Sequence, residues 1–165
     1  VMTHFKPTID LGKYKKYTFT LKRGDDIKKN IDYKNIPNLP GVYVRYNDDN
    51  VTPHYIGKAG MNSNGTITKQ GLSGRLTNTR GISKNMFKNG FNIPSGVKLI
   101  SGNKSVSGNG LYKILMNTNN WESMTWDVYV THNGSVGDNS VELEATLIRD
   151  YVNQFGVIPS CNNKQ

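Results

Sequence analysis

The chain has 165 residues, of which 35% are hydrophobic, and its mean hydropathy is −0.58. This length suits one domain with a substantial core, and no apolar run approaches the roughly 18 residues that a membrane span needs. Lysine and arginine number 21 against 12 for aspartate and glutamate, a net charge of +9 that favours a polyanionic partner.

Several classes of protein are disfavoured by what the sequence lacks. Residues 1–6 do not contain the apolar segment of a secretory signal, so we expect a cytoplasmic protein with no membrane partner. Cys161 is the only cysteine, so no intrachain disulfide can form. The three histidines show no metal-ligand spacing, and no phosphate-binding loop or dinucleotide fingerprint is present.

The first 40 residues form a basic extension. Residues 16–22 alternate, with Tyr17, Phe19 and Leu21 on one side, which predicts a half-buried strand. This strand could lie at the edge of a sheet with a solvated face, or it could be an arm that contacts phosphates. We favour the edge strand.

A β-hairpin is predicted around residues 47–50, which favour turns. The runs 42–46 and 54–56 on either side are rich in β-branched and aromatic residues. The two arms carry Tyr43 and Tyr55. A loop with an odd number of residues would place the two rings opposite each other on one face, and an even number would place them on opposite faces.

The second arm of the hairpin has well-defined limits in the sequence. Pro53 cannot donate to a strand ladder, so pairing should begin at His54. We expect Gly57 to end the strand, which would place Lys58 at its exit.

The middle of the chain alternates between loops and short elements. Residues 60–71 form a polar loop with too little apolar content to pack, and a short helix is predicted over 72–76. Residues 78–110, rich in Asn, Gly and Ser, read as an insertion that is either functional or a surface loop. A helix over 111–116 and a third strand over 126–131 follow.

The distribution of charge along the chain also favours a polyanionic partner. No aspartate or glutamate occurs between Ile56 and Glu122, a stretch that directly follows the hairpin. A polyanion near the hairpin would therefore meet no repelling negative charge from this stretch. The basic residues proposed to contact such a partner are Lys69, Arg80, Lys84, Lys88 and Lys104.

A long helix is predicted near the end of the chain. Asn139 and Glu142 have the spacing of a capping box, the helix runs to about Phe155, and Gly156 suits its C-terminal end. Within it, Glu144 falls on the apolar face, whereas Glu142 points elsewhere. A carboxylate on such a face is costly unless it is paired or binds a metal, so Glu144 stands out from Glu142 by its position on the helix alone.

The motifs Gly41-Val42-Tyr43 and Tyr55-Ile56-Gly57 resemble the two triplets of the GIY-YIG nucleases. In that family an arginine follows on the first helix, a glutamate lies on a later helix, and an asparagine follows a proline. Arg75, Glu144 and Asn162 stand at the corresponding places, and the resemblance covers residues 39–163 apart from the insertion.

The resemblance implies a fold and a site. The fold would be α+β: a single domain with a small, mainly antiparallel sheet of three central strands flanked by helices. Glu144 would hold Mg²⁺ or another divalent ion such as Mn²⁺. Tyr43 would be the general base, with Tyr55 shaping the site or sharing this role. Arg75 would bind the scissile phosphate, Lys58 would add positive charge, and Asn162 would orient the site.

The function implied is a metal-dependent endonuclease that cuts double-stranded DNA. The small type II restriction enzymes of the family, which cut as homo-oligomers, are the most similar in layout. A phage or mobile-element nuclease and a catalytically silent nucleic-acid-binding module are the alternatives. The silent module is favoured by Thr79, which stands where the family often has His or Tyr one helical turn after the arginine.

Overall fold

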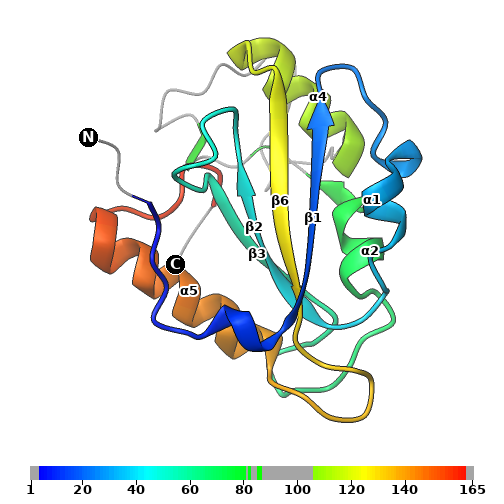
Figure 1. The fold of residues 1–165 in the computed structure, drawn as a ribbon, viewed down its shortest axis with the longest axis vertical. Coiled ribbons are helices and arrows are strands. Elements are labelled where there is room, and N and C mark those ends of the chain that lie inside the picture. The colour runs from blue at the N-terminus through cyan, green and yellow to red at the C-terminus, as the bar shows by residue number, and fades with distance from the viewer. Residues whose placement is uncertain (1–3, 81, 83–84, 87–105, 163–165) are drawn as a thin grey trace.

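The protein has an α+β fold, as the sequence predicts, built on a four-stranded antiparallel sheet (Figure 1). The computed structural model describes residues 4–80, 82, 85–86 and 106–162. The strands lie in the order β1-β6-β2-β3, where β1 is Lys15–Lys22, β6 is Ser123–Val130, β2 is Gly41–Tyr46 and β3 is Tyr55–Ala59. The strand that comes last in the sequence therefore lies between the first and the second.

This sheet has four strands rather than the expected three, because the N-terminal extension contributes β1. This strand pairs with β6 along its full length. Phe19 and Leu21 are buried while Thr18 and Thr20 are exposed, which is the alternation predicted for residues 16–22. Since β1 is an outer strand of the sheet, the edge-strand interpretation is confirmed.

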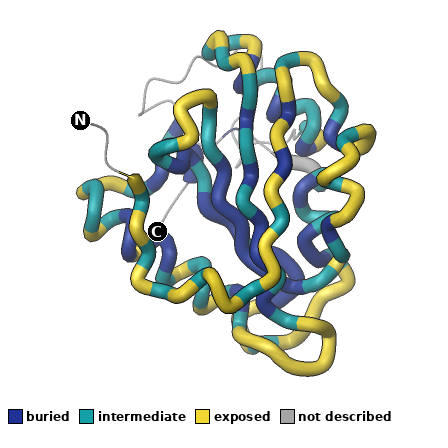
Figure 2. Tube along the Cα trace, in the orientation of Figure 1, coloured by how far each residue is buried: buried dark blue, intermediate teal, exposed yellow. Residues whose placement is uncertain are grey.

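Helices cover both faces of the sheet (Figure 1). On one face, α2 (Leu72–Leu76) and α4 (Gly108–Asn119) pack with buried strand residues such as Trp126. On the other face, α5 (Ser140–Phe155) packs with residues such as Val44. The central part of the sheet, between the two layers, is accordingly the most buried part of the chain (Figure 2).

The N-terminal segment is tied to α5. The backbone N–H and the hydroxyl of Thr8 both donate to the carboxylate of Asp150, at 2.8 and 2.9 Å. The 3-10 helix η1 (Leu11–Lys13) follows, and Leu11 packs in the same apolar cluster as α5. The N-terminal extension is therefore an integral part of the domain.

Helix α5 begins and ends where the sequence predicts. The side chain of Asn139 accepts hydrogen bonds from the N–H groups of Val141 and Glu142, and Gly156 adopts the left-handed conformation, with φ of 80°, just after the last turn. Within the residues that the structure describes, no helix is long and apolar enough to cross a membrane.

The two ends of the predicted insertion, 78–110, pair with each other as the short strands β4 (Thr79–Arg80) and β5 (Val106–Ser107). Between them, Ile82 and Met86 are buried. The rest of the insertion lies outside the described residues. Two further short helices, η2 (Ile27–Lys29) and α1 (Ile31–Lys34), connect β1 to β2.

Strand β3 is longer than expected. It continues through Gly57 to Ala59, because Gly57 and Lys58 pair in register with Tyr43 and Val42 of β2. Gly57 therefore does not end the strand, and Lys58 lies within it rather than at its exit.

Two other strand boundaries can be compared with the prediction. Pairing after Pro53 begins as expected, since the N–H of His54 donates to the carbonyl of Arg45 at 2.8 Å. The strand predicted over 126–131 begins earlier, at Ser123, because its first residues pair with β1.

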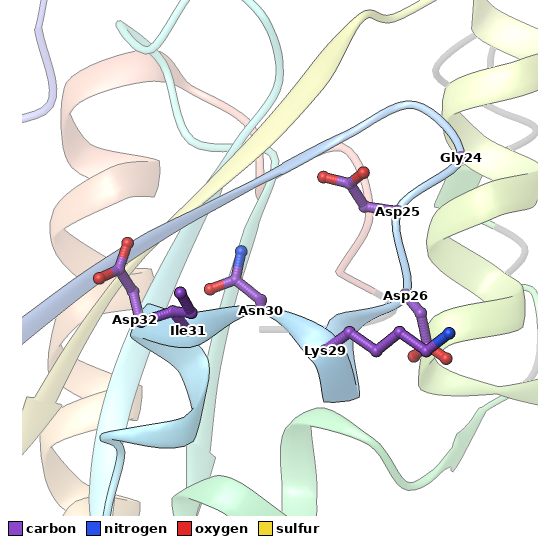
Figure 3. Close-up of a pocket in the computed structure, with 7 residues that line it drawn as sticks. All are labelled: Gly24, Asp25, Asp26, Lys29, Asn30, Ile31 and Asp32. Atoms are coloured by element: carbon purple, nitrogen blue, oxygen red, sulfur yellow. The ribbon is translucent and has the colours of Figure 1, made fainter.

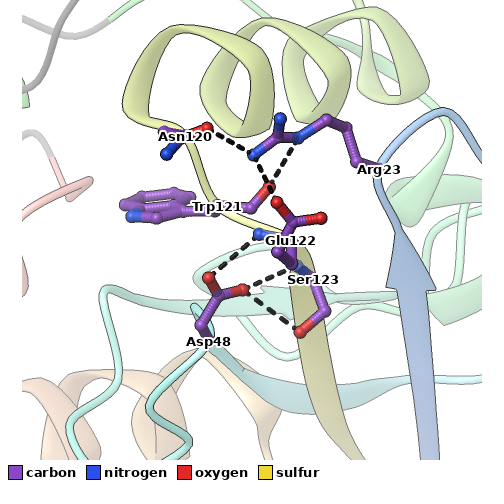
Figure 4. Close-up of polar contacts among 6 residues, drawn as sticks. All are labelled: Arg23, Asp48, Asn120, Trp121, Glu122 and Ser123. Atoms are coloured by element: carbon purple, nitrogen blue, oxygen red, sulfur yellow. Dashed lines mark hydrogen bonds and ion pairs between the residues drawn. The ribbon is translucent and has the colours of Figure 1, made fainter.

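Asp48 holds the loop of the hairpin against the start of β6 (Figure 4). Its carboxylate accepts hydrogen bonds from the N–H groups of Glu122 at 2.9 Å and Ser123 at 2.6 Å, and from the Ser123 hydroxyl. Burial acts to raise the pKa of Asp48. The hydrogen bonds, together with the charge of Arg23, outweigh burial and hold this pKa below its ordinary value.

We expect Asp48→Asn to lower the free energy of unfolding at neutral pH and to make this free energy depend less on pH in the acidic range. Because the folded-state pKa is lowered, the carboxylate stabilises the fold above the unfolded pKa of about 3.9, and this stabilisation is lost as the pH falls through the folded pKa. The carboxylate is exposed, so the effect should stay below about 1 kcal/mol. Urea unfolding at pH 7 and pH 3 measures it. Asp49→Asn, a neighbour whose carboxylate bonds within its own turn, is the control.

Candidate active site

The hairpin brings its two tyrosines together on one face of the sheet. Tyr55 pairs with Arg45, so the loop between the paired residues is 46–54, an odd number. Tyr43 pairs with Gly57, which places the tyrosines diagonally across the two strands. Their ring centroids are 6.0 Å apart at an interplanar angle of 32°. Of the two arrangements that the sequence left open, the same-face arrangement is confirmed, but the tyrosines lie diagonally and not directly opposite each other.

Gly57 makes this arrangement possible. A Cβ atom on Gly57 would lie 2.5 Å from Cζ and 2.6 Å from the hydroxyl of Tyr43, and 2.8 Å from Cε2 of Tyr55. The ring of Tyr43 therefore extends over β3, the outer strand. Tyr43 is fully buried, and Tyr55 is half-buried.

Lys58 and Arg75 line one open pocket beside β3. The pocket has a volume of about 340 Å³, and Lys58 donates from Nζ to the carbonyl of Met61 at 3.0 Å. Its other lining residues are Ala59, Gly60, Asn62, Thr68 and Gln70. Two cations and no carboxylate line the pocket, which suits an anionic ligand.

The loop over 60–71 is folded rather than loosely attached, contrary to our expectation. Met61 is buried and forms a β-bridge with Ile67, and the N–H of Thr68 donates to the carbonyl of Gly60 at 2.9 Å. The apolar content of the loop is low, but one buried side chain and its backbone hydrogen bonds are enough to shape one wall of the pocket.

Arg75 is positioned by a cap that comes from outside its own helix. Gly71, the residue before α2, has no side chain to cap it. Instead, Oδ1 of Asn38 accepts hydrogen bonds from the N–H groups of Gly71 at 2.8 Å and Gly74 at 3.2 Å, and from the hydroxyl of Ser73 at 3.2 Å. Asn38 thereby sets where this short helix, and Arg75 on it, lies.

We expect Asn38→Ala to destabilise the fold by about 1 kcal/mol, the usual cost of losing an N-terminal cap. The loss should appear in the free energy of unfolding measured in urea. Asn35→Ala is the matched control, since the Asn35 side chain makes no hydrogen bond within the described residues. Equal stability of the two variants would show that the trans cap does not hold α2.

Glu144 reaches the same region from α5. The hydroxyl of Ser140, at the start of this helix, donates to the carbonyl of Ala59 at 3.1 Å and so ties α5 to the end of β3. One turn later Glu144 is half-buried, whereas Glu142 is exposed. The predicted difference between the two glutamates is confirmed.

Burial raises the pKa of Glu144 to about 7, although the positive charges of Lys58 and Arg75 act to lower it. Among the residues that the structure describes, none donates a hydrogen bond to this carboxylate or forms an ion pair with it. Three predicted site residues, from β3, α2 and α5, are thus electrostatic neighbours.

Asn162 binds the free edge of β3. Its Oδ1 accepts from the N–H of Ile56 and its Nδ2 donates to the carbonyl of Ile56, both at 2.9 Å. The N–H of Cys161 donates to the carbonyl of His54 at 2.7 Å. Asn162 therefore substitutes for a neighbouring strand at Ile56, the residue that follows Tyr55 in β3.

Only some of the residues predicted to contact DNA lie in the described part of the chain. Lys69 is exposed beside the pocket, and its carbonyl accepts a hydrogen bond from Asn38. The backbone of Arg80 lies in β4. Lys84, Lys88 and Lys104 lie outside the described residues, so their role stays a prediction.

Thr79, at the position where the resemblance to the GIY-YIG nucleases would place a His or Tyr, is not on a helix here. Helix α2 ends at Leu76, and Thr79 lies in β4. His54 is buried and accepts a hydrogen bond at Nε2 from Nε of Arg45, 2.7 Å away.

Arg45 is the residue of this region that sequence reasoning missed. It is 1% exposed, and its guanidinium carbon lies 4.7 Å from the centre of the Tyr55 ring. An arginine in a strand is usually expected to face solvent. In the sequence, only its position across the hairpin from Tyr55 could have indicated that Arg45 is buried.

A larger pocket, of about 570 Å³, lies between β1 and α1 and contains three aspartates (Figure 3). Their carboxylates do not converge in Figure 3. Asp25 accepts from the N–H of Lys22, and Asp26 accepts from the N–H of Lys28. These acids stabilise the turn, and we do not assign a site to them.

No cluster of three or more His, Cys, Asp or Glu side chains that could hold a metal occurs in the described part of the chain. In comparisons with known proteins, no family model, curated protein or solved structure matched this chain. The interpretation of the site therefore rests on its own residues.

Proposed function

We propose that this protein is a metal-dependent endonuclease that hydrolyses phosphodiester bonds in duplex DNA, with a GIY-YIG fold. The observation that carries this proposal is the meeting of Glu144, Lys58 and Arg75 at the edge of β3. The same strand carries Tyr55 and lies under the ring of Tyr43. An acid, two cations and a tyrosine pair suit hydrolysis of a phosphate ester.

Glu144 would hold the divalent ion. Mg²⁺ binds proteins through one or two carboxylates and keeps its other positions for water and substrate phosphates, so a single carboxylate fits it. The Glu144 carboxylate is half-buried and takes no hydrogen bond from a described residue, which leaves its oxygens available. When bound, the ion would stabilise negative charge on the scissile phosphate.

Arg75 and Lys58 would bind the phosphate. The planar guanidinium can donate two parallel hydrogen bonds to phosphate oxygens, whereas the ammonium acts as a point charge. Both face a pocket without a carboxylate lining, so an entering phosphate would meet favourable potential. Their charge would also offset the negative charge that develops in the transition state.

Tyr43 would accept the proton of the attacking water, with Tyr55 holding it in place or sharing the role. The Tyr43 hydroxyl lies over β3, above Gly57. Because Tyr43 is fully buried, bulk water does not reach it, and the water that it deprotonates would have to enter together with the phosphate.

The test is incubation of the protein with mapped plasmid DNA and Mg²⁺ or Mn²⁺. Discrete fragments would support a type II restriction endonuclease, which we favour. Such an enzyme would act as a homo-oligomer, because one site cuts one strand. Random nicks would instead support a phage or mobile-element nuclease. Absence of cleavage with both ions would contradict the proposal.

A catalytically silent nucleic-acid-binding module is the second candidate. It is favoured by the end of α2 at Leu76, which leaves Thr79 off the helix. A silent module would bind DNA with an affinity that falls steeply with salt, by a log–log slope of about −0.9 for each neutralised phosphate, and would show no cleavage at any metal concentration.

A further inference from the structure

Arg45 is a buried cation without a counter-ion among the described residues. It is 1% exposed, and its Nε donates to Nε2 of His54 at 2.7 Å. The two terminal nitrogens of its guanidinium make no hydrogen bond to an oxygen or nitrogen atom in the described part of the chain, and the Cys161 thiol is a polar neighbour of the guanidinium. Burying a charge is costly unless it is paired, so a core position would ordinarily be filled by an apolar side chain of similar size.

Aromatic rings take the place of a counter-ion. The guanidinium carbon lies 4.7 Å from the ring centre of Tyr55 and 5.3 Å from that of Tyr112. A cation over the face of an aromatic ring is attracted by the ring's electron density, and the attraction is larger where water is excluded. Arg45 therefore contacts the ring of Tyr55 in β3 and, at the same time, the ring of Tyr112 in α4.

The position of Arg45 relates it directly to the tyrosine pair. It lies two residues after Tyr43, on the same face of β2, and pairs with Tyr55 across the hairpin. Tyr55 therefore contacts Arg45 on one side and is 6.0 Å from the ring of Tyr43. Movement of the guanidinium would remove this contact from the face of the Tyr55 ring.

A second set of contacts fixes Arg45 itself. The ring of His54 stacks on Trp121 at 5.1 Å and 9°, and Trp121 lies in the turn that Asp48 and Arg23 hold (Figure 4). Burial, and then the charge of Arg45, lower the pKa of His54 well below its ordinary value. His54 is therefore neutral and can accept at Nε2 from Arg45.

We propose that Arg45 is a positioning residue of the active site: it holds Tyr55 in place against Tyr43 and favours negative charge on the Tyr55 hydroxyl. This inference rests on the proposed nuclease function. Titratable groups that contact the Arg45–Tyr55 pair in the described residues include Tyr43 from β2, His54 before β3, Tyr112 from α4 and Cys161 from the C-terminal segment. Arg45 carries a permanent positive charge 4.7 Å from the ring centre of Tyr55, so its removal should change the electrostatic environment of the Tyr55 hydroxyl.

The first measurement does not require cleavage. In protein labelled with ¹³C at tyrosine Cζ, the Tyr55 resonance is identified by its absence from Tyr55→Phe. We expect its titration midpoint to rise by about one pH unit in Arg45→Met, which removes the charge but keeps the bulk. The midpoint should be unchanged in Lys22→Met, a control that removes an exposed charge from β1. An equal midpoint in wild type and folded Arg45→Met would overturn the electrostatic part of the proposal.

The second measurement is single-turnover cleavage. Arg45→Met should lower the rate at saturating DNA by about tenfold or more while the DNA concentration at half-saturation changes less than twofold. An unchanged rate would overturn the positioning role.

Where Arg45→Met does not fold, Arg45→Lys replaces it. The charge remains in this variant, so the Tyr55 titration midpoint should stay near that of wild type. The loss of planar stacking should still lower the cleavage rate. If wild-type protein cleaves no DNA, the proposed function fails, and the Tyr55 midpoint alone decides whether Arg45 acts on this tyrosine.

Discussion

Glu144→Gln is expected to abolish metal-dependent DNA cleavage, with a loss of about 10³-fold or more, since a bound cation contributes several kcal/mol to the transition state of phosphate hydrolysis. The amide keeps the size of the side chain and removes the charge that would bind the ion. DNA binding in the absence of metal should stay close to that of wild type, because Lys58 and Arg75 remain. Cleavage assays with Mg²⁺ and binding assays in a chelator measure the two effects.

Glu142→Gln is the matched control. Glu142 lies on the same helix but is exposed, so its replacement should cost only a small part of helix stability and should leave cleavage unchanged. Comparable cleavage by Glu144→Gln and wild type, or equal losses in the two variants, would remove Glu144 from the metal site.

If Glu144 holds the ion as proposed, metal binding is linked to stability. A carboxyl group whose folded pKa of about 7 exceeds its ordinary value of 4.5 destabilises the folded protein as the pH rises between these values, by up to about 3 kcal/mol. We expect the metal-free protein to lose stability from pH 5 to pH 8, and Glu144→Gln to remove most of this loss. Mg²⁺ should stabilise wild type at pH 8 more than at pH 5. Thermal unfolding with and without Mg²⁺ tests this without any cleavage assay.

Tyr43→Phe is expected to lower the cleavage rate by about 10²-fold or more while leaving folding and DNA binding intact. The ring that covers Gly57 would remain, and only the hydroxyl that would take the proton is removed. Tyr55→Phe should have a smaller effect, because this ring still packs against Tyr43 and over the Arg45 guanidinium.

Single-turnover cleavage at saturating Mg²⁺ separates the two tyrosines. An inactive Tyr55→Phe beside an active Tyr43→Phe would assign the proton to Tyr55, the more exposed of the pair. Full activity of both variants would mean that the tyrosines only fill the core and would contradict the proposed mechanism.

The elements that the sequence predicts well depend on neighbours in the chain. The turn at residues 47–50 and the cap and end of α5, at Asn139 and Gly156, are set by local hydrogen bonds and backbone preferences. Glu144 could be found because helical periodicity fixes which residues share a face.

The features that sequence reasoning missed depend on residues far apart in the chain. The cap of α2 comes from Asn38, which lies 33 residues before Gly71. Strand β1 was expected to lie at an edge, but its pairing with β6 required a partner about a hundred residues away. Arg45 is buried because α4 supplies Tyr112 above it, and no local pattern indicates this contact.

The central place of β6 has a consequence for how the chain folds during synthesis. While the ribosome is still translating the residues before Ser123, β1 has no partner and β2 can pair only with β3. The nascent chain can form the hairpin early, since its contacts are local, but the four-stranded sheet must wait for β6. Glu144 follows later still, so Lys58 and Arg75 acquire their acidic neighbour only after the sheet can close. Under the proposed function, a nascent chain should therefore be unable to cut DNA until Glu144 has left the ribosome.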